Sequence, residues 1–365
     1  MNLLIPNLGS TSLKYQILEM PSEKVLAKGK LERVRDYHDA IAQIGTGETP
    51  IHAVGFKAVH GGPRYRGTFV IDEGVIRAME EFLPAAPAHN AIYLSAIRAF
   101  QDTLPGIPLV AAFETEFHAT IPEHARAYGV PALWRKEGVA KYGFHGASHQ
   151  YIRERCREML GGDVRLVSAH LGGSSSMCAI DRGRSVDTTM GFSPQSGLEN
   201  ATRHGDLDVF GVLFMIERHG WTAEEARRQL AGEGGLAGLS GIAGGDVRDL
   251  EEAEEKGNDC AALALQVFVY EVRKTLGAYA VAMGGLDAIA FTGGIGENSA
   301  RLRAACCEKL GFLGVELDPE ANQSGSGDRL VSAPNSKVKV LALATNEELI
   351  VARRAYQKLK RQERP

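Results

Sequence analysis

The chain has 365 residues, of which 44 % are hydrophobic and 24 % are charged, and its formal net charge is −4. These values are typical of a globular protein and argue against a general nucleic-acid-binding or membrane-binding surface. The 42 glycines exceed what the roughly 7 % of average usage would give. Because they follow no collagen period and are not combined with much proline, they predict tight turns in a folded chain.

The length and the cysteines indicate a two-domain cytoplasmic protein. Single cores stop growing near about 250–300 residues, so a chain of 365 residues favours two domains. The five cysteines are odd in number and form no CxxC pair, which is typical of reduced cytoplasmic thiols. The N-terminus has no basic segment before its brief apolar run, so we expect no signal peptide. The apolar segment 261–283 contains charged residues near its middle, which predicts a buried helix rather than a membrane span.

Short β-branched runs and helical patterns alternate along the chain. The runs that predict strands are 3–6, 15–18, 54–59, 109–113, 165–169, 288–291 and 338–344. The patterns that predict helices are 74–82, 91–102, 149–160, 208–218, 246–283 and a last helix after Thr345. Thr345 and Glu348 match a capping box, which predicts where that last helix begins. The mixture indicates an α/β fold with helices covering sheets.

An internal repeat is the most informative feature of the organisation. Residues 3–17 read LLIPNLGSTSLKYQI and residues 166–180 read LVSAHLGGSSSMCAI, at a constant offset of 163. Each copy predicts a hairpin whose Gly/Ser/Thr tip exposes backbone N–H groups and hydroxyls, which suits a phosphate. Any two hairpins share glycine and serine at their turns, but the matching register favours a real duplication with a junction near residue 150.

Further glycine clusters follow predicted strands at 59–62 and 291–298, and another at 238–241 precedes Asp246. Such turns let the backbone approach a nucleotide closely. Neither the G-x-G-x-x-G spacing nor a P-loop is present, so the sequence supports neither a dinucleotide fold nor a P-loop NTPase. His145 and His149 are four residues apart, but Gly146 argues against a metal pair inside a helix. A serine hydrolase is not supported, because no G-x-S-x-G elbow occurs.

Motifs of one known family occur in order along nearly the whole chain. They are NLGSTSLK (7–14), GFKAVHGG (55–62), PAHN (87–90), FETEFH (113–118), YGFHGASH (142–149), AHLGGSSS (169–176), DTTMGFSP (187–194), TRHGD (202–206), GLSG (238–241), FTGGIGEN (291–298) and TNEEL (345–349). With these motifs the chain resembles the acetate kinases, of the acetate and sugar kinase/Hsp70/actin superfamily, over residues 2–355. The set is specific for the family and less specific for the acid that is phosphorylated.

The resemblance implies two duplicated ribonuclease-H-like (actin-like ATPase) domains with a cleft between them. The N-terminal domain would comprise 1–148 plus 346–365, and the C-terminal domain 149–345 would bind nucleotide and form a homodimer. Domain closure is expected, with hinges near 148–150 and 345–347. The implied reaction is a reversible, in-line phosphoryl transfer between ATP and a short-chain carboxylate, giving ADP and an acyl phosphate with Mg²⁺ or Mn²⁺. A small carboxylate and a nucleotide would be its partners, without nucleic acid or membrane.

The resemblance also assigns residues to the site. The catalytic residues would be Glu114, His145 and Arg203. The metal would be held by Asn7 and Glu347, which the last helix would bring together. The acid would contact Lys57, Val59, Ala88, Phe144 and Pro194. The nucleotide would be surrounded by Lys14, Ser168, Ala169, His170, Leu171, Gly172, Asp246, Val247, Arg248, Gly293, Gly294, Ile295, Gly296 and Glu297.

Five positions depart from the family pattern. Lys57 stands where the family has arginine, so the charge is kept but the bidentate fork is lost. Glu114 replaces an aspartate and moves its carboxylate by one methylene, and errors of about 1 Å can cost about 10²-fold in rate. Gly173 replaces an asparagine and removes an amide donor. Ala88 replaces a leucine and would enlarge the acyl pocket, which Phe56, in place of a histidine, could refill.

These departures leave two hypotheses. If Lys57 and Glu114 compensate each other, the chain is a carboxylate kinase that acts on acetate or a related acid. If they do not, it is a nucleotide-binding homologue with weak or altered activity on another acceptor. A sugar or polyol kinase of the same superfamily is a third possibility, with Glu114 as base. The motifs TRHGD and YGFHGASH favour a carboxylate acceptor.

Overall fold

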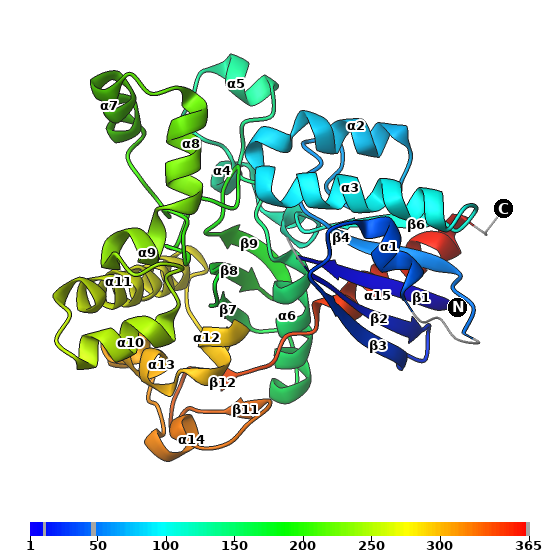
Figure 1. Cartoon of the computed structure of the whole chain (residues 1–365). Helices are drawn as coiled ribbons and strands as arrows, with labels where there is room; N and C mark the ends of the chain where they lie inside the picture. Colours follow the sequence, from blue (N-terminus) through cyan, green and yellow to red (C-terminus); the bar gives the residue numbers. More distant parts are fainter. Residues whose placement is uncertain (10–11, 45–48, 363–365) are drawn as a thin grey trace.

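The structure, a computed structural model, describes residues 1–9, 12–44 and 49–362, with the side chains of 87–89 excepted. Ser10 and Thr11, at the tip of the first predicted hairpin, lie outside the described residues. The described part forms two six-stranded sheets with helices packed on their faces (Figure 1). The strand orders are β3-β2-β1-β4-β6-β5 and β11-β12-β10-β7-β8-β9. The predicted α/β fold is confirmed.

The elements have the following bounds. The strands are β1 (Asn2–Leu8), β2 (Ser12–Glu19), β3 (Lys24–Glu32), β4 (Ala53–Ala58), β5 (Thr68–Val70), β6 (Leu109–Phe113), β7 (Arg165–His170), β8 (Ser176–Asp181), β9 (Arg184–Thr188), β10 (Ala288–Thr292), β11 (Arg329–Leu330) and β12 (Lys339–Ala342). The helices are α1 (Tyr37–Ala42), α2 (Glu73–Glu81), α3 (Pro87–Thr103), α4 (Glu123–Arg126), α5 (Ala132–Lys136), α6 (Gly146–Leu160), α7 (Val209–His219), α8 (Ala223–Gly232), α9 (Gly235–Ser240), α10 (Val247–Glu255), α11 (Asp259–Ala282), α12 (Gly293–Asn298), α13 (Ala300–Cys307), α14 (Pro319–Gln323) and α15 (Glu347–Gln362). Short 3₁₀ turns are η1 (Leu83–Ala85), η2 (Phe117–Thr120) and η3 (Gly311–Leu313).

The two sheets have the same topology. Read in reverse, the second order becomes β9-β8-β7-β10-β12-β11, which corresponds strand by strand to the first. In both sheets the two hairpin pairs are antiparallel, the two central pairs are parallel and the last pair is antiparallel. Leu4 pairs with Ile17, whereas Val167 pairs with Ala179, so the hairpin registers differ by one residue despite the constant sequence offset. The internal repeat therefore corresponds to a duplicated sheet.

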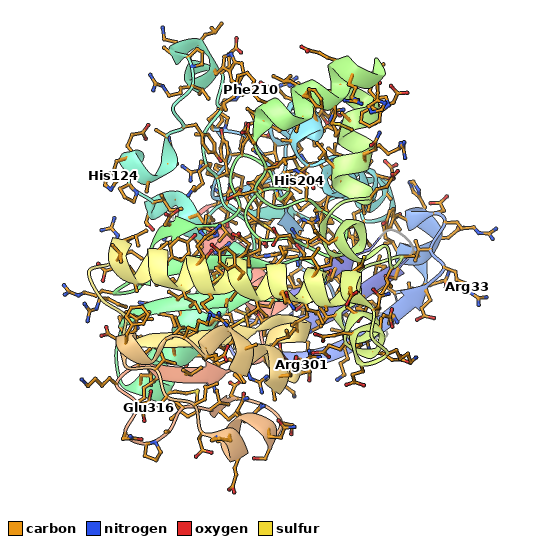
Figure 2. All side chains as sticks on the ribbon, turned by 90° about the vertical axis from the view of Figure 1, so that its left-hand side faces the viewer. Arg33, His124, His204, Phe210, Arg301 and Glu316 are labelled. Atoms are coloured by element: carbon orange, nitrogen blue, oxygen red, sulfur yellow. The ribbon has the colours of Figure 1, made fainter. Side chains whose placement is uncertain are left out.

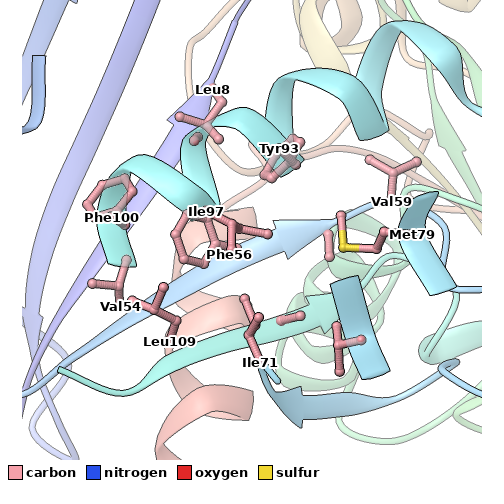
Figure 3. Packing of buried hydrophobic residues seen from close by; sticks show 14 of the residues in the cluster. Leu8, Val54, Phe56, Val59, Ile71, Met79, Tyr93, Ile97, Phe100 and Leu109 are labelled. Atoms are coloured by element: carbon pink, nitrogen blue, oxygen red, sulfur yellow. The ribbon is translucent and has the colours of Figure 1, made fainter. Parts of the chain in front are cut away.

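Strand alternation separates two hydrophobic layers on the first sheet. Phe56 on β4 is fully buried on the face that α3 covers, and its ring meets Phe100 edge-on, 5.2 Å between centroids (Figure 3). Position 88 lies twelve residues from Phe100 along α3, or about 18 Å at 1.5 Å per residue. The expectation that Phe56 refills the space beside Ala88 is therefore wrong. The Ala88 side chain itself lies outside the described residues.

The last helix, α15, covers the opposite face of the first sheet. Leu3 and Ile5 of β1 pack there against Val351 and Ala355. The predicted capping box requires the Glu348 N–H to donate to the Thr345 hydroxyl. It is wrong, because Asn346 caps the helix instead: its Oδ1 accepts from the Leu349 N–H at 3.1 Å. The helix begins one residue later than a cap at Thr345 would place it, at Glu347. Thr345 is thereby left to bond elsewhere.

The second sheet is covered by α6 on one face and by α11 and α13 on the other. Leu166, Cys178 and Ile180 pack against Ile152 and Cys156 of α6. Helix α15 thus covers the first sheet and α6 covers the second. These two helices contact one another between the two sheets (Figure 1). Arg354 of α15, which is buried, donates from Nε to Gln150 of α6 at 3.0 Å.

The predicted helix 246–283 is divided into two helices. Gly257 has a φ of +86°, and Asn258 caps the second helix by accepting from the Ala261 N–H at 3.0 Å. The second helix, α11, runs across the front of Figure 2 and is buried on one side only. Tyr270 and Val281 are 61 % and 81 % exposed, so the expectation of a buried helix holds for one side of α11 and not for the other. None of the helices in the described part combines the length and apolar character needed to cross a bilayer.

Candidate active site

Glycine-rich turns of the second half surround a cavity of about 630 Å³. It is lined by Gly172, Gly173, Ala201, Gly244, Gly245, Asp246, Val247, Arg248, Glu251, Gly294, Ile295, Asn298 and Ser299. A Cβ atom at Gly173 or Gly294 would have no neighbour within 4 Å and would stand in open space. Because backbone rather than side chains forms this wall, a nucleotide can approach it closely, and the cavity fits ATP or ADP.

Two of these turns are tied together by backbone hydrogen bonds. The N–H groups of Ile295 and Gly296, in α12, donate to the Leu171 carbonyl at 2.9 and 3.1 Å. Gly293 has a φ of +76°, and a Cβ there would lie 2.6 Å from the Leu171 oxygen. Only glycine fits this close approach, which fixes the β7–β8 hairpin against the turn that follows β10.

Arg303 supports the α12 turn from behind, and the sequence motifs did not indicate it. Its side chain is 1 % exposed and donates from Nη1 to the carbonyls of Gly296 and Glu297, both at 2.9 Å. Its Nε donates to Asn322 Oδ1 at 2.8 Å. Burial lowers the pKa of Arg303 to about 10. The sequence carried no signal for it, because arginines on helices are mostly exposed.

The opposite wall of the cavity begins at helix α10. Asp246 caps this helix by accepting from the Arg248 N–H at 2.9 Å, and its carboxylate pairs with the Arg248 guanidinium at 2.6 Å. The hydrogen bond from Arg248 lowers the pKa of Asp246 to about 2. The Arg248 side chain is largely exposed, so its cationic group stands at the cavity mouth.

A cluster of one cation and two carboxylates lies between the halves of the molecule. Lys57 follows Phe56 on β4, so alternation turns it toward α15, where its Nζ donates to Glu347. Burial would lower the pKa of Lys57, but the carboxylates of Glu347 and Glu114 raise it above its usual range. Burial raises the pKa of Glu114 to about 7, and its Oε1 is buried without a hydrogen-bond partner in the described part.

Asn7 lies beside this cluster but bonds a different glutamate from the one expected. Its Nδ2 donates to Glu348 Oε1 at 2.8 Å, while Glu347 pairs with Lys57. The described residues contain no group of three His, Cys, Asp or Glu side chains arranged to hold a metal. Mg²⁺ commonly binds through one or two carboxylates plus waters and substrate phosphates. The carboxylates here, including the unpartnered Glu114 Oε1, fit a cation bound in that way.

His145 caps the N-terminal end of α6 in a left-handed conformation, with a φ of 55°. Its ring stacks on His170 at 4.3 Å between centroids, and its nitrogens contact the Ser176 and Ser174 hydroxyls at 2.9 and 3.1 Å. Burial lowers the pKa of His145 well below its usual range, with neighbouring His170 as a further cause. The imidazole is therefore neutral near pH 7 and offers one N–H donor.

Arg203 is a half-buried cation. Its Nη1 donates to the Pro194 carbonyl at 2.8 Å, and no carboxylate of the described residues forms an ion pair with it. Burial lowers the pKa of Arg203 to about 10, which still leaves it charged at neutral pH. A cation of this kind suits a phosphoryl or carboxylate oxygen.

The expected acyl pocket is only partly assembled in the described residues. Val59 and Phe144 are buried in the same hydrophobic cluster. His60 follows Val59, contacts the Phe144 ring at 5.6 Å and has its Nε2 3.0 Å from the Phe192 carbonyl. Pro194 lies two residues beyond Phe192 and is held through Arg203.

All the expected nucleotide residues except Lys14 fall into three groups. Those that line the cavity are Gly172, Asp246, Val247, Arg248, Gly294 and Ile295. Those that lie behind its wall are Leu171, Gly293, Gly296 and Glu297. Those on β7 are Ser168 and His170, which face α6, and Ala169, which is buried on the α11 face. Lys14 is exposed on β2, in register with Asn7.

Comparison with known proteins gives a consistent answer over nearly the whole chain. Residues 38–353 match the model of the acetokinase family. The acetate kinase of Fervidobacterium nodosum is 40 % identical over 97 % of this chain and 96 % of its own, and that of Geobacillus kaustophilus is 42 % identical over 95 % and 96 %. Among solved structures, Porphyromonas gingivalis acetate kinase has a TM-score of 0.88 at 35 % identity, covering 98 % of this chain and 99 % of that one. A propionate kinase from Francisella tularensis has a TM-score of 0.89 at 30 % identity, covering 97 % and 98 %. The chain belongs to the acetokinase family.

Proposed function

We propose that this chain transfers a phosphoryl group from ATP to a short-chain carboxylate, giving ADP and an acyl phosphate in a reversible reaction. The relatives support this proposal, since those compared are acetate kinases and a propionate kinase. The single observation that carries it is the tip of the β7–β8 hairpin. Gly172 and Gly173 line the cavity, and the next residue, Ser174, contacts His145 at 3.1 Å. One turn thus joins a nucleotide-sized cavity to the cationic and imidazole groups.

The residues around that turn have roles that follow from their chemistry. Phosphoryl transfer places charge on the equatorial oxygens of the transferred group, so fixed donors there lower the barrier. Arg203 supplies a positive charge without a competing carboxylate, and neutral His145 supplies an N–H. Neither group must first lose a strong ionic partner.

The charged cluster at the start of α15 is proposed to hold the metal and the acid. Mg²⁺ or Mn²⁺, when bound with ATP, would supply positive charge to the phosphate oxygens. Glu347 and Asn7, with Glu348 beside them, would hold it, since Glu347 and Glu348 begin α15 and Asn7 of β1 bonds Glu348. Lys57 neutralises Glu347 in the present arrangement and would contact the acid's carboxylate as a single cationic point. Val59, Phe144 and Pro194, with Ala88, would contact the alkyl end.

The experiment is an acceptor panel with the full-length chain and Mg-ATP. Acids of two to five carbons and a matched set of sugars and polyols are compared, with hydroxylamine trapping the acyl phosphate. We expect hydroxamate from at least one acid and no phosphorylated polyol. ATP binding without turnover of any acid would support the nucleotide-binding homologue instead.

A matched pair of arginine variants ties the activity to the site. Arg203→Gln should lower kcat by about 10²–10³-fold, the usual cost of removing one transition-state donor. Arg182→Gln, whose side chain is 83 % exposed, is the control and should leave kcat unchanged. Equal activity of the two variants would contradict the role given to Arg203.

The organisation of the molecule is proposed in the same terms. We infer an N-terminal domain of 1–148 plus 346–365 and a C-terminal domain of 149–345, supported by the return of α15 to the first sheet. Closure over ATP would bend the chain near 148–150 and 345–347.

A homodimer through the second half is supported by the exposed side chains of Leu263, Tyr270 and Val281 on α11. The cysteines of the described part are free thiols, which supports a cytoplasmic location. Light scattering of the purified chain tests the dimer.

A further inference from the structure

Polar side chains form a continuous chain of hydrogen bonds between β7, α6 and the β7–β8 hairpin tip. Ser168 Oγ contacts His149 Nδ1 at 2.9 Å, and His149 Nε2 contacts Ser176 Oγ at 2.9 Å. Ser176 Oγ also contacts His145 Nδ1 at 2.9 Å, and His145 Nε2 contacts Ser174 Oγ at 3.1 Å. Each imidazole therefore lies between two hydroxyls, and the one inner hydroxyl, that of Ser176, lies between two imidazoles.

The two ends of this chain have different surroundings. Ser168 and His149 are fully buried, and His149 Nδ1 is the partner that the Ser168 hydroxyl has among the described residues. Ser174 is half-buried at the hairpin tip, beside the cavity-lining Gly173. A hydroxyl proton at Ser168 must therefore be donated to His149, whereas one at Ser174 can turn to water or to an anion.

This difference decides which group is the donor in every hydrogen bond of the serine–histidine series. If Ser168 donates to His149 Nδ1, then the proton of that imidazole is on Nε2 and is donated to Ser176. Ser176 already accepts one bond, and its own proton goes to His145 Nδ1. His145 then holds its proton on Nε2, at the hairpin tip. The opposite direction would leave the Ser168 hydroxyl buried without an acceptor.

We propose that His149, acting with Ser168 and Ser176, is a positioning residue that fixes His145 in the tautomer with its proton on Nε2. Burial keeps both imidazoles neutral, because it lowers the pKa of His145 and of His149 well below the usual range. The N–H that results lies beside the cavity wall and can be donated to an anionic oxygen. Its use in phosphoryl transfer rests on the function proposed above, but the tautomer itself does not.

A parallel chain strengthens the assignment. The Thr345 hydroxyl donates to Ser148 at 3.0 Å, and Ser148 Oγ contacts His170 Nδ1 at 2.8 Å. Since Ser148 already accepts from Thr345, its proton goes to His170, which then holds its own proton on Nε2. The stacked rings of His145 and His170 thus adopt the same tautomer, and both chains begin at buried or interdomain hydroxyls rather than at the cavity.

The test reads the tautomer directly, on the full chain labelled with ¹⁵N-histidine. Long-range ¹H–¹⁵N spectra distinguish a protonated from an unprotonated ring nitrogen, and His145→Gln identifies the His145 signals. At neutral pH without ligands we expect Nδ1 of His145 unprotonated and Nε2 protonated. A proton on Nδ1 in the unmodified chain would overturn the proposal.

Variants at residues that do not hydrogen-bond the His145 ring make the test specific. Ser168→Ala removes the hydroxyl that sets the direction, so the fraction with the proton on Nε2 should fall to about one half and kcat by about twofold. Adding His149→Leu to Ser168→Ala should restore a single tautomer, because Ser176 then has only His145 to donate to. Ser185→Ala removes a buried serine contact to His118 of the same length and should leave the His145 signals unchanged. If the His145 tautomer is unchanged in Ser168→Ala, the proposal that the hydrogen-bonded serines and His149 fix it is refuted.

The spectra require no turnover, so the two proposals can fail separately. A chain that phosphorylates no acid but shows the expected tautomers contradicts only the proposed function. An active enzyme whose His145 holds its proton on Nδ1 contradicts only the hydrogen-bond chain.

Discussion

Replacing Lys57 by methionine should destabilise the free protein strongly. Methionine keeps the apolar stem but removes the charge, so Glu347 is left without its cation in a nearly buried position. Side-chain exposures of 23 % for Lys57 and 12 % for Glu347 place this pair between two limits. Breaking a fully buried pair costs about 3–5 kcal/mol, and an exposed pair about 0–1 kcal/mol. We therefore expect a loss of about 2–3 kcal/mol in the free energy of unfolding.

Urea unfolding without ligands measures this loss. A protein with two halves can unfold in more than one step. We therefore compare the urea midpoint of the first unfolding transition of each variant, with the same m-value for all variants. Lys256→Met is the matched control, because Lys256 pairs with Glu252 at 2.5 Å but both side chains are about two-thirds exposed, 71 % and 66 %. It should produce no measurable shift.

A second variant separates lost charge from lost packing. In Lys57→Met with Glu347→Gln, neither charge of the pair remains, so most of the lost stability should return. If Lys57→Met shifts the transition no more than Lys256→Met does, the charge-pair reasoning is refuted. If the double variant is as unstable as the single one, packing rather than charge is responsible.

Three further changes test other parts of the structure. Gly294→Val projects a side chain into the open cavity, so KM for ATP should rise by at least about tenfold while the urea midpoint stays constant. Glu114→Gln tests linkage. The pKa of Glu114 is raised from 4.5 to about 7 by burial, so its contribution to stability is present at low pH and is lost as pH rises through about 7. The unmodified chain should lose stability relative to Glu114→Gln between pH 5 and 8, as paired melts would show. Asn346→Ala should cost about 1 kcal/mol in unfolding experiments as a lost helix cap, and more than Ser22→Ala, whose hydroxyl caps no helix.

Local patterns predicted the parts of the site that a few consecutive residues determine. The glycine clusters at 171–173 and 293–296 predicted turns, and the structure has turns at both places. At Gly293 no side chain fits, whereas at Gly173 a side chain would point into open space. The repeat predicted two hairpins, and the two sheets agree in topology beyond those hairpins. Periodicity also placed the last helix, but its first residue depends on whether Thr345 or Asn346 caps it, and both side chains are chemically suited to do so.

Pairings across the molecule could not be predicted in this way. Asn7 and Glu348 are separated by 341 residues, and only the packing of α15 decides that Asn7 meets Glu348 while Glu347 meets Lys57. The serine–histidine chain did leave a signal. Ser168 and Ser176 occupy strand positions beside buried apolar residues, and this pattern could have indicated polar groups on a covered face, although no prediction was drawn from it.

Duplication explains why the candidate site lies where it does. Asn7 and His170 are equivalent at the offset of 163, and alternation turns both toward the helix that covers their sheet. Asn7 thus bonds Glu348 of α15, and His170 bonds Ser148 of α6. Because α6 and α15 pack on one another, the same strand position of both sheets delivers a polar side chain to the region where these two helices meet. Asn7 places an amide beside carboxylates, whereas His170 places an imidazole beside hydroxyls, so the two equivalent positions have different chemistry. In the proposed site, the oxygens that would hold the metal lie at the first sheet and its covering helix α15, and the neutral N–H donors lie at the second sheet and α6.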